Sequence, residues 1–311
     1  MNKNQYDVLI IGGGPAGLSA AIYAARAELK TGLIEFSAPG GKLINTHNLE
    51  NYPGIDSGLT GGDVAVKFFL QSQNMGAEYI AEKVVKIDNL KSFANKIVEL
   101  ENGEKLETKT IIIASGTTPI PLDVPGYWKY YSKGVSNCVV CDGALHKGQD
   151  IALIGGGNAA TEESLFGAGF AKTVYVINEY PSFISEGVTM KKIRDTKNIN
   201  LMVDSKVLEI KGDDEKVTGI VIKTKEGIKE IPLTGVFTYV GFTPASKFLE
   251  NTKITDKKGF IDVDLKTAET KVDGVFAAGD ILNKPFKQVT GATSDGTHAA
   301  LAAKKYIDLN S

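Results

Sequence analysis

The chain has 311 residues and a formal net charge of −2, with 42% hydrophobic and 23% charged residues. This composition is typical of a globular protein, and the length suffices for two domains rather than one. The net charge is near neutral and the basic residues are scattered, so the sequence has no basic cluster that would bind nucleic acid or an anionic membrane, and neither is an expected partner.

The first residues, MNKNQYDVLI, run from a short polar start directly into an apolar segment that predicts a β-strand. No secretory leader is therefore expected. No apolar run approaches the roughly 20 residues that a membrane-spanning helix requires. Only two cysteines occur in a chain that is otherwise typical of the cytosol, and because structural disulfides are rare in that compartment, this pair indicates chemistry. We expect a cytoplasmic localisation.

The segment DVLIIGGGPAGLSAAIYAARA, which begins at Asp7, predicts a strand, a tight turn and a helix. In it, Gly12, Gly14 and Gly17 form a GxGxxG motif, whose glycines allow the turn, the approach of a pyrophosphate and close helix–strand packing. The start of the helix would supply amide donors to the phosphates. Glu35 ends the next predicted strand, where its carboxylate can accept from a ribose hydroxyl. Together these features predict a dinucleotide site rather than a purely structural turn.

Both cysteines lie in NCVVCDG, residues 137–143, where Asp142 directly follows Cys141. The CxxC spacing lets two thiols close a small disulfide ring and reopen it readily, as redox catalysis requires. The Asp142 carboxyl group could pass protons during the exchange. The motif therefore favours a redox-active disulfide between Cys138 and Cys141.

Two structural alternatives to a redox disulfide remain open. A purely structural disulfide would be a weak crosslink, because a loop this short removes little entropy from the unfolded chain. A zinc half-site would need further ligands, and the chain has no second CxxC and few histidines. Those histidines are His47, His146 and His298. No metal site is predicted.

A second strand, turn and helix are predicted in DIALIGGGNAATEESLFGAGF, which begins at Asp150. Here Gly155, Gly157 and Ala160 form the variant GxGxxA. When the two copies are aligned on their strands, Asn178 takes the place of the acidic residue that ends the strand in the first copy. This copy is either a second nucleotide site or a duplicated domain that kept its packing glycines after its ligand was lost.

The segments TIIIASGTTP (110–119) and GVFTYVGFTP (235–244) each run from a strand through a glycine-containing loop to a proline. They read as two crossings between a first domain and a domain inserted into it. The sequence thus predicts an α/β fold with two Rossmann-like, three-layer domains of the FAD/NAD(P)-binding type. We expect a discontinuous domain of residues 1–117 plus 244–311, and an inserted domain of residues 118–243 that carries the CxxC.

These motifs together resemble the low-molecular-weight thioredoxin reductases over nearly the whole chain. The likeness rests on GGGPAG (12–17), PGGKL (39–43), ENYPG (50–54), CVVCDG (138–143), GGGNAA (155–160), GFTP (241–244) and GVFAAGD (274–280). The resemblance implies a homodimeric flavoprotein that reduces thioredoxin, with FAD in the discontinuous domain and the redox disulfide in the inserted one.

The resemblance also implies which residues bind FAD. They are Gly12, Gly14, Pro15, Ala16 and Gly17 around the pyrophosphate, Glu35 at the adenosine ribose, Gly41, Lys42 and Asn51 along the cofactor, Gly279 and Asp280 at the ribityl chain, and Lys287, Gln288 and Val289 near the flavin. Two of these depart from the family pattern, since Lys42 replaces its usual glutamine and Lys287 its arginine.

By the same resemblance, Cys141 would face the flavin and receive its electrons, with Asp142 as general acid. Cys138 would be the thiol that attacks the disulfide of thioredoxin. The domains of this family rotate relative to each other during turnover, and the crossings at Gly116–Pro119 and Gly241–Pro244 are natural hinges for that motion.

The chain departs from the family in VYVINEYPSFIS, residues 174–185. NADPH-using members carry a His-Arg-Arg segment and a third arginine where this chain has Asn178, Glu179, Tyr180 and Ile184. Those arginines bind the 2′-phosphate through charge-assisted hydrogen bonds worth roughly 1.5–3 kcal/mol each. Their loss, and a carboxylate in their place, should lower NADPH affinity by orders of magnitude.

Reduced ferredoxin is therefore the expected electron donor, as in relatives of thioredoxin reductase whose nucleotide site is degenerate, because a flavin can accept single electrons. NADH is an alternative, with Asn178 or Glu179 accepting from the free 2′-hydroxyl, and NADPH bound through other contacts is another. A ferredoxin–NAD(P) oxidoreductase on the same scaffold would not need Cys138 and Cys141. A flavin-binding redox sensor is the non-enzymatic alternative, and no partner-binding tail supports it.

Overall fold

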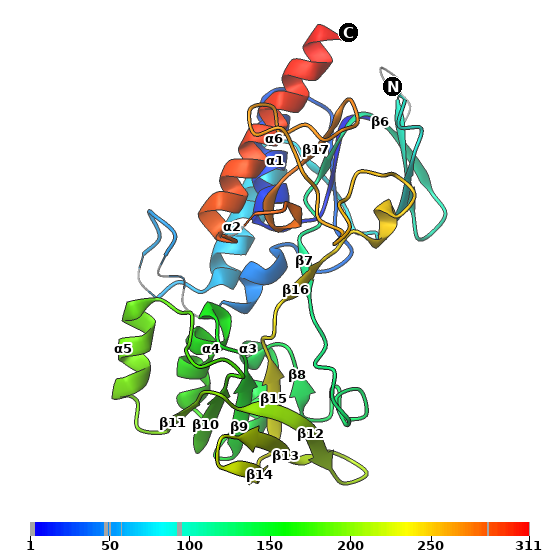
Figure 1. Cartoon of the computed structure of the whole chain (residues 1–311). Helices are drawn as coiled ribbons and strands as arrows, with labels where there is room; N and C mark the ends of the chain where they lie inside the picture. Colours follow the sequence, from blue (N-terminus) through cyan, green and yellow to red (C-terminus); the bar gives the residue numbers. More distant parts are fainter. Residues whose placement is uncertain are drawn as a thin grey trace. The chain divides into compact units, whose positions relative to one another are not determined.

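The structure is a computed structural model that describes residues 4–46, 49, 51–56, 58–91, 95–284 and 286–310. The chain divides into two compact units. The discontinuous unit comprises Met1–Thr118 and Thr243–Ser311, and the inserted unit comprises Pro119–Phe242. In Figure 1 the inserted unit is the part coloured from green to yellow.

The discontinuous unit is built on a seven-stranded sheet. Its strands are β1 (Gln5–Ile11), β2 (Thr31–Ile34), β3 (Glu78–Ile80), β4 (Val84–Asp88), β5 (Lys96–Leu100), β6 (Lys105–Ile113) and β17 (Val275–Ala277). They follow the order β3-β2-β1-β6-β5-β4, and β17 also pairs with β6. The central strands β1, β2 and β6 are parallel and carry continuous apolar runs, as expected for strands covered on both faces.

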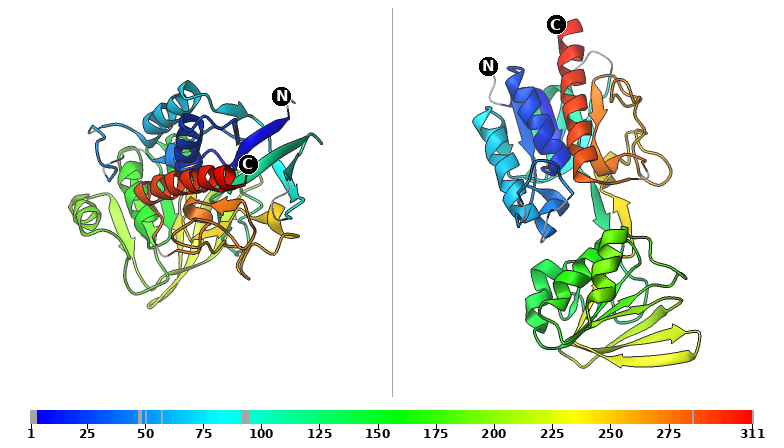
Figure 2. Two further views of the ribbon diagram at one scale, coloured as in Figure 1. Left: turned by 90° about the horizontal axis from the view of Figure 1, so that it is seen from above. Right: turned by 90° about the vertical axis from the view of Figure 1, so that its left-hand side faces the viewer.

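Three helices of this unit are α1 (Pro15–Arg26), α2 (Gly61–Asn74) and α6 (Val289–Leu309). Figures 1 and 2 show α6 beside α1. The two helices approach closely because Gly296 faces α1, and a methyl group there would lie 2.0 Å from the carbonyl oxygen of Ala16. The unit also contains the 3-10 helices η1 (Gly41–Asn45), η3 (Lys247–Leu249) and η4 (Gly279–Ile281).

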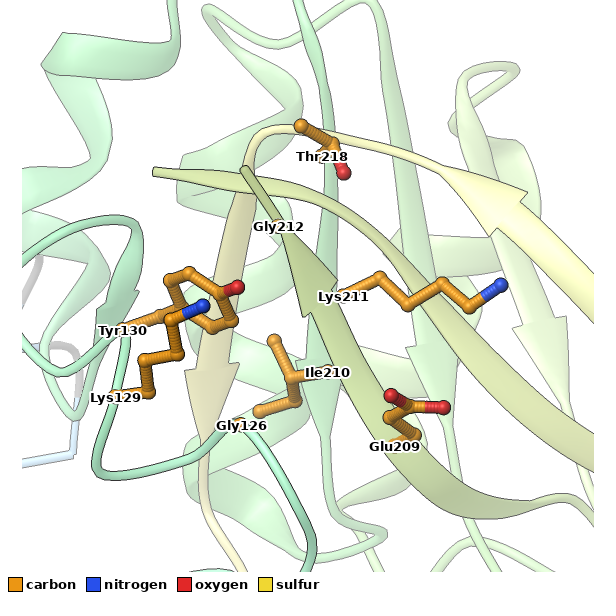
Figure 3. A pocket seen from close by; sticks show the side chains of 8 residues that line it. All are labelled: Gly126, Lys129, Tyr130, Glu209, Ile210, Lys211, Gly212 and Thr218. Carbon is orange, nitrogen blue, oxygen red and sulfur yellow. The ribbon is translucent and has the colours of Figure 1, made fainter. Parts of the chain in front are cut away.

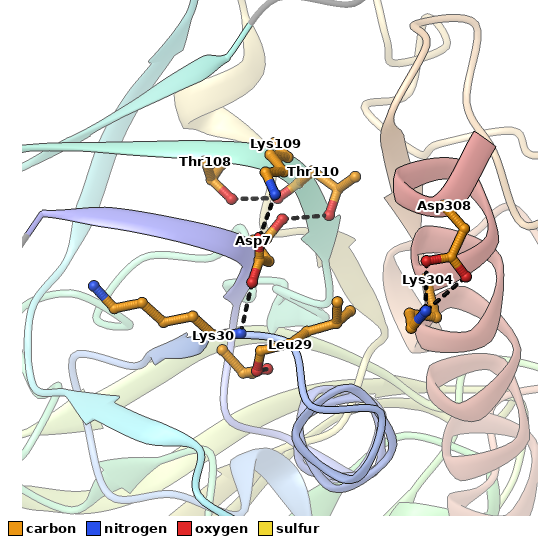
Figure 4. A network of polar contacts seen from close by, with 9 residues as sticks. Asp7, Leu29, Lys30, Thr108, Lys109, Thr110, Lys304 and Asp308 are labelled. Carbon is orange, nitrogen blue, oxygen red and sulfur yellow. Dashed lines mark hydrogen bonds and ion pairs between the residues drawn. The ribbon is translucent and has the colours of Figure 1, made fainter. Parts of the chain in front are cut away.

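A polar network fixes the start of β1 against its neighbours (Figure 4). The Asp7 carboxylate pairs with the Lys109 ammonium at 2.7 Å and accepts from the backbone N–H of Lys30 at 2.9 Å. The Thr110 hydroxyl donates to the carbonyl oxygen of Asp7 at 3.0 Å. These contacts hold in register the strand that leads into the first glycine-rich turn.

The inserted unit contains a five-stranded parallel sheet and a three-stranded antiparallel sheet. The first is formed by β8 (Val135–Ser136), β9 (Asp150–Ile154), β10 (Thr173–Ile177), β11 (Ile199–Met202) and β15 (Gly235–Thr238), and the second by β12 (Lys206–Gly212), β13 (Val217–Thr224) and β14 (Gly227–Pro232). The helices are α3 (Val139–Asp142), α4 (Asn158–Ala168), α5 (Gly187–Asp195) and the 3-10 helix η2 (Gly143–His146). The two chain crossings, β7 (Thr117–Pro119) and β16 (Phe242–Pro244), pair with each other.

Each unit thus opens its parallel sheet with a strand, a glycine-rich turn and a helix: β1 and α1 in one, β9 and α4 in the other. The predicted α/β class with Rossmann-like topology is confirmed. No helix in the described ranges combines the length and the apolarity needed to cross a membrane.

Candidate active site

The first glycine-rich turn joins β1 to α1 and requires glycine at two positions. Gly12 has φ +107°, and a methyl group there would lie 2.4 Å from the carbonyl oxygen of Ala114. A methyl group at Gly17 would lie 1.8 Å from the carbonyl oxygen of Gly12. At Gly14, by contrast, no described atom lies within 4 Å of a methyl group built on the residue, so the space there is open. This gap lies at the N-terminus of α1, where backbone amides can approach a phosphate.

The Glu35 side chain lies directly under this turn and is only 8% exposed. Its Oε2 accepts from the backbone N–H of Gly13 at 2.8 Å, and its Oε1 accepts from the N–H and the hydroxyl of Ser37, both at 2.8 Å. A carboxylate offers about four acceptor positions. Glu35 therefore ties the turn to the end of β2 and keeps acceptor capacity for a ribose hydroxyl.

The predicted residues of the PGGKL segment lie beside the turn. The backbone N–H of Gly40 donates to the carbonyl oxygen of Gly13 at 2.7 Å, and a methyl group built on Gly41 would lie 3.1 Å from Cα of Gly14. Lys42 then reaches a segment far along the chain, where its Nζ lies 2.5 Å from Oδ2 of Asp280. The structure thus brings three separate predicted segments to one place.

The remaining predicted residues join the same cluster from the C-terminal segment. Asn51 Nδ2 donates to Oε1 of Gln288 at 3.3 Å, at the start of α6. Lys287 Nζ donates to the carbonyl oxygens of Asp280 at 2.6 Å and Leu282 at 3.2 Å. Burial lowers the pKa of Lys287, and the Asp280 carboxylate partly opposes that shift. Asp280 is thus bonded by two lysine ammonium groups, that of Lys42 at its carboxylate and that of Lys287 at its backbone carbonyl oxygen.

These residues fit an FAD molecule. The open space at Gly14 would take the pyrophosphate, and the buried carboxylate of Glu35 suits a ribose. Asp280 with Lys42 gives a charged site for the rest of the cofactor. Three supporting residues were not among the site residues predicted from the sequence. They are Thr117, which accepts from Lys42 Nζ at 2.9 Å, Asp295, which accepts from the N–H of Gly279 at 3.0 Å, and Phe260, whose ring centroid lies 4.7 Å from Lys287 Nζ.

The two cysteines form a disulfide in the inserted unit, with their Cα atoms 5.3 Å apart. Cys138 is the N-cap of α3, a single helical turn that begins at Val139 and ends at Asp142, and Cys141 lies within this turn. Within it, the N–H of Cys141 points to Sγ of Cys138 at 3.1 Å, and the N–H of Asp142 donates to the carbonyl oxygen of Cys138 at 3.2 Å. The predicted catalytic residues therefore share one turn.

His146 follows this turn and is engaged elsewhere. Its Nδ1 lies 2.9 Å from the hydroxyl of Thr234, and its ring packs edge-on against Phe237. Burial lowers the pKa of His146, although the Asp142 carboxylate partly opposes that shift. Within the described ranges, no group of three His, Cys, Asp or Glu residues could hold a metal ion.

The backbone of the α3 turn contacts a pair of side chains that no sequence motif marks, Glu163 on α4 and Tyr239 just after β15. The Tyr239 hydroxyl accepts from the backbone N–H of Val139 at 3.0 Å and is hydrogen-bonded to the Glu163 carboxyl group. Burial raises the pKa of Glu163 to about 7. This is a titratable group directly behind the CxxC turn.

The second glycine-rich turn keeps the backbone form of the first. Gly155 has φ +144°, and a methyl group there would lie 2.4 Å from the carbonyl oxygen of Tyr239. Gly157 precedes α4 with φ −95° and ψ −178°, close to the −72° and −179° of Gly14 before α1. As at Gly14, no described atom lies within 4 Å of a methyl group built on Gly157.

The segment after β10 does not present the carboxylate that Glu35 presents after β2. Asn178 is only 3% exposed, and its amide serves its own segment: Nδ2 donates to the carbonyl oxygen of Ser182 at 2.7 Å, and Oδ1 accepts from the N–H of Tyr180 at 3.3 Å. The exposed Glu179 pairs loosely with Lys206 at 3.5 Å. The end of β10 therefore carries an exposed carboxylate, and the amide of its buried asparagine is already bonded within the same segment.

Two surface pockets lie on the inserted unit. One runs along this segment and is lined by Ser182, Phe183, Ser185, Gly187, Met190, Arg194, Leu201 and Val203, so it contains one arginine. The other is shown in Figure 3 and is lined by Gly126, Lys129, Tyr130, Glu209, Ile210, Lys211, Gly212 and Thr218. Lys211 in the latter pairs with Glu230 at 2.5 Å, and none of the predicted site residues lines it.

Comparison with known proteins gives consistent matches. The family model described as "pyridine nucleotide-disulphide oxidoreductase" matches residues 6–296. The thioredoxin reductase of Mycoplasmopsis pulmonis is 40% identical over 301 residues, which cover 96% of this chain and 97% of that protein. The thioredoxin reductase of Bacillus subtilis is 36% identical over 305 residues, which cover 97% and 95%. The crystal structure of Lactococcus lactis thioredoxin reductase is similar with a TM-score of 0.94 and 38% identity, covering 98% of this chain and 99% of that one.

Proposed function

Because the chain belongs to the pyridine nucleotide-disulphide oxidoreductase family, and within it to the low-molecular-weight thioredoxin reductases, we propose that it reduces thioredoxin with electrons from reduced ferredoxin. The protein is a flavin-dependent disulfide oxidoreductase that binds FAD. The observation that carries the proposal is the Cys138–Cys141 disulfide in a single turn of the inserted unit, combined with an acidic strand end at Asn178 and Glu179.

The disulfide chemistry uses three residues of the α3 turn. When bound, FAD supplies the electron pair that opens the Cys138–Cys141 bond. The Cys138 thiolate attacks a sulfur of the thioredoxin disulfide and forms a mixed disulfide, while the other thioredoxin sulfur leaves. Cys141 then attacks Cys138, which re-forms the intramolecular disulfide and releases reduced thioredoxin. Asp142, next to Cys141, holds and transfers a proton during these exchanges.

The discontinuous unit holds the cofactor in this proposal. Gly12, Gly14, Pro15, Ala16 and Gly17 bind the pyrophosphate, Glu35 the ribose, Gly41, Lys42 and Asn51 the adjoining part, Gly279 and Asp280 the ribityl chain, and Lys287, Gln288 and Val289 the region near the flavin. Support comes from the way these residues converge around the open space at Gly14. We also propose that the enzyme is a cytoplasmic homodimer, which sedimentation of the FAD-loaded protein would test.

Ferredoxin is favoured as the donor by what the nucleotide-like site of the inserted unit lacks. A 2′-phosphate carries about two negative charges at neutral pH, and Glu179 at this edge would repel it. Asn178 has both ends of its amide engaged within its own segment, so a ribose hydroxyl would have to displace a bond already formed. A ferredoxin delivers single electrons and needs no nucleotide site.

One observation favours each pyridine nucleotide as an alternative donor. Glu179 is exposed enough to accept from the 2′-hydroxyl of NADH, because its contact with Lys206 is only a loose surface pair at 3.5 Å. Arg194 lines the pocket beside the segment and is a cation that could bind the 2′-phosphate of NADPH. In the NADPH alternative, this single arginine would do the work of the three arginines that NADPH-using members of the family carry.

A turnover experiment tests the proposed reaction. The FAD-loaded enzyme is mixed anaerobically with oxidised thioredoxin and ferredoxin that a photochemical reductant keeps reduced, and thioredoxin thiols are counted over time. We expect thioredoxin to be reduced only when enzyme and ferredoxin are both present. Equal rates with micromolar NADPH and no ferredoxin would contradict the proposed donor. Reduction of NAD(P)⁺ by ferredoxin without thioredoxin reduction would instead indicate a ferredoxin–NAD(P) oxidoreductase.

A further inference from the structure

The backbone of the turn that carries the two cysteines is bonded to a hydrogen-bonded pair of side chains from other elements. The Tyr239 hydroxyl accepts from the backbone N–H of Val139 at 3.0 Å. The Glu163 carboxyl group accepts from the backbone N–H of Val140 and is hydrogen-bonded to the Tyr239 hydroxyl. The N–H groups of both residues between Cys138 and Cys141 thus donate to this pair of side chains.

The Glu163 carboxyl group lies in an environment that makes its charge costly. Its Oε2 is buried and has no hydrogen-bond partner within the described part of the chain. The groups that act on its charge are Tyr239 from the end of β15 and Glu162 from its own helix, while the turn above it carries Asp142 and the two cysteines. Burial is the main cause that raises the pKa of Glu163 to about 7, and the bond from Tyr239 partly opposes it.

Reduction of the disulfide changes the charge of the α3 turn, in which the backbone N–H of Val140 bonds to this carboxyl group. A neutral S–S bond becomes a thiol and a thiolate, and a negative charge close to a buried carboxylate is strongly unfavourable in a low-dielectric site. The affinity of Glu163 for a proton must therefore rise when the cysteines are reduced. The two equilibria are linked, because a group that binds a proton more tightly in the reduced state favours that state.

We propose that Glu163 and Tyr239 are positioning residues for the Cys138–Cys141 disulfide, and that Glu163 takes up a proton when the disulfide is reduced and gives it up when the disulfide re-forms. Tyr239 and Glu163 keep the backbone of the turn in place through the N–H groups of Val139 and Val140 while the S–S bond opens and closes. The proposal rests on the redox role of the disulfide in the proposed function, and it does not depend on the donor or on thioredoxin.

The proton balance of the step follows directly. Two electrons enter and the Cys138–Cys141 bond breaks, so one sulfur takes a proton from solvent and becomes a thiol while the other stays a thiolate. The ionised Glu163 carboxylate takes a second proton from solvent. When a disulfide substrate re-oxidises the pair, the two electrons leave with the substrate, and the proton of the thiol and the proton of Glu163 both return to solvent.

The test is the equilibrium of the FAD-loaded enzyme with oxidised and reduced dithiothreitol between pH 6 and 9. Thiols are trapped by alkylation and counted by mass spectrometry, and since Cys138 and Cys141 are the only two cysteines, every trapped thiol reports on this pair. One additional proton changes an equilibrium constant tenfold per pH unit. We expect the equilibrium constant for reduction of the disulfide to change tenfold more per pH unit in the wild type than in Glu163→Gln. This difference should appear in a pH window that begins near pH 7. The control Glu162→Gln, with the same change on the same helix, should keep the wild-type slope, while its window begins at a lower pH because the Glu162 charge no longer raises the pKa of Glu163.

Identical pH slopes for the wild type and Glu163→Gln would overturn the proposal. A second variant keeps the test decisive if Glu163→Gln does not fold. Tyr239→Phe removes the hydrogen bond that lowers the pKa of Glu163, so the window of additional proton uptake should move to higher pH. A window that stays in place would count equally against the proposal. Loss of the ferredoxin or thioredoxin reaction would leave this small-molecule equilibrium unchanged, so the two failures are distinguishable.

Discussion

The Cys138→Ser variant should bind FAD like the wild type and lose at least about a thousandfold in its rate of thioredoxin reduction, the scale on which loss of a nucleophile acts. A serine hydroxyl cannot form a disulfide, so neither the intramolecular bond with Cys141 nor the mixed disulfide with thioredoxin can form. The α3 turn itself should survive, since its backbone is also held by Tyr239 and Glu163. The measurements are flavin absorbance for cofactor content and the ferredoxin-driven formation of thioredoxin thiols.

Val140→Ala is the matched control, because it trims the same turn and keeps both thiols. Its thioredoxin reduction should stay within about tenfold of the wild type, as for a modest truncation at a half-buried position. Cys141→Ser should lose as much as Cys138→Ser, because both sulfurs belong to one disulfide. Cys138→Ser turnover within tenfold of the wild type would refute the proposed role of the CxxC.

The Gly14→Ala variant should fold and bind FAD about tenfold to a hundredfold more weakly. Gly14 has φ −72° and ψ −179°, a conformation open to alanine, and no described atom would touch the added methyl group. The methyl group would instead occupy the space into which the pyrophosphate fits. Such overpacking costs about 1–3 kcal/mol, which corresponds to that loss of affinity. Flavin titration of the apoprotein, followed by fluorescence, measures it.

Gly157→Ala is the equivalent change in the second glycine-rich turn, with nearly the same backbone angles and equally open space. It should leave FAD affinity and ferredoxin-driven turnover unchanged, because the proposed reaction places no nucleotide there. A loss of FAD affinity in Gly157→Ala that equals the loss in Gly14→Ala would show that the methyl group acts on stability rather than on the cofactor. Gly17→Ala is unsuitable for this purpose, since its methyl group would lie 1.8 Å from a carbonyl oxygen.

The sequence predicts the glycine-rich turns and Glu35 well because their geometry is local. The glycines, the strand before them and the helix after them lie within a few residues of one another, and each enforces the same turn. The meeting of Lys42 with Asp280 is different, since these residues are 238 positions apart and come together only through the order of strands in the sheet. Only the family resemblance placed them at one site.

Glu163 and Tyr239 could not be predicted, because a glutamate on a helix is usually exposed. The packing of α3 against α4 brings Glu163 and the CxxC turn together, and it is a tertiary contact that no local pattern encodes. Asn178 illustrates the opposite case. Alignment of the two strand–turn–helix copies placed an acceptor there for a ribose, but asparagine side chains compete for nearby backbone groups. The structure shows its amide bonded to Tyr180 and Ser182.

The central claim is that this flavoprotein takes its electrons from a ferredoxin and not from a pyridine nucleotide. The most direct measurement is the flavin absorbance of the oxidised enzyme on anaerobic mixing with NADPH, NADH or reduced ferredoxin in separate experiments, each in an amount that supplies the two electrons of the flavin and the two of the disulfide. We predict that reduced ferredoxin bleaches the flavin within seconds, and that neither nucleotide does so at micromolar concentration. Rapid bleaching by micromolar NADPH or NADH, with no response to reduced ferredoxin, would contradict the account.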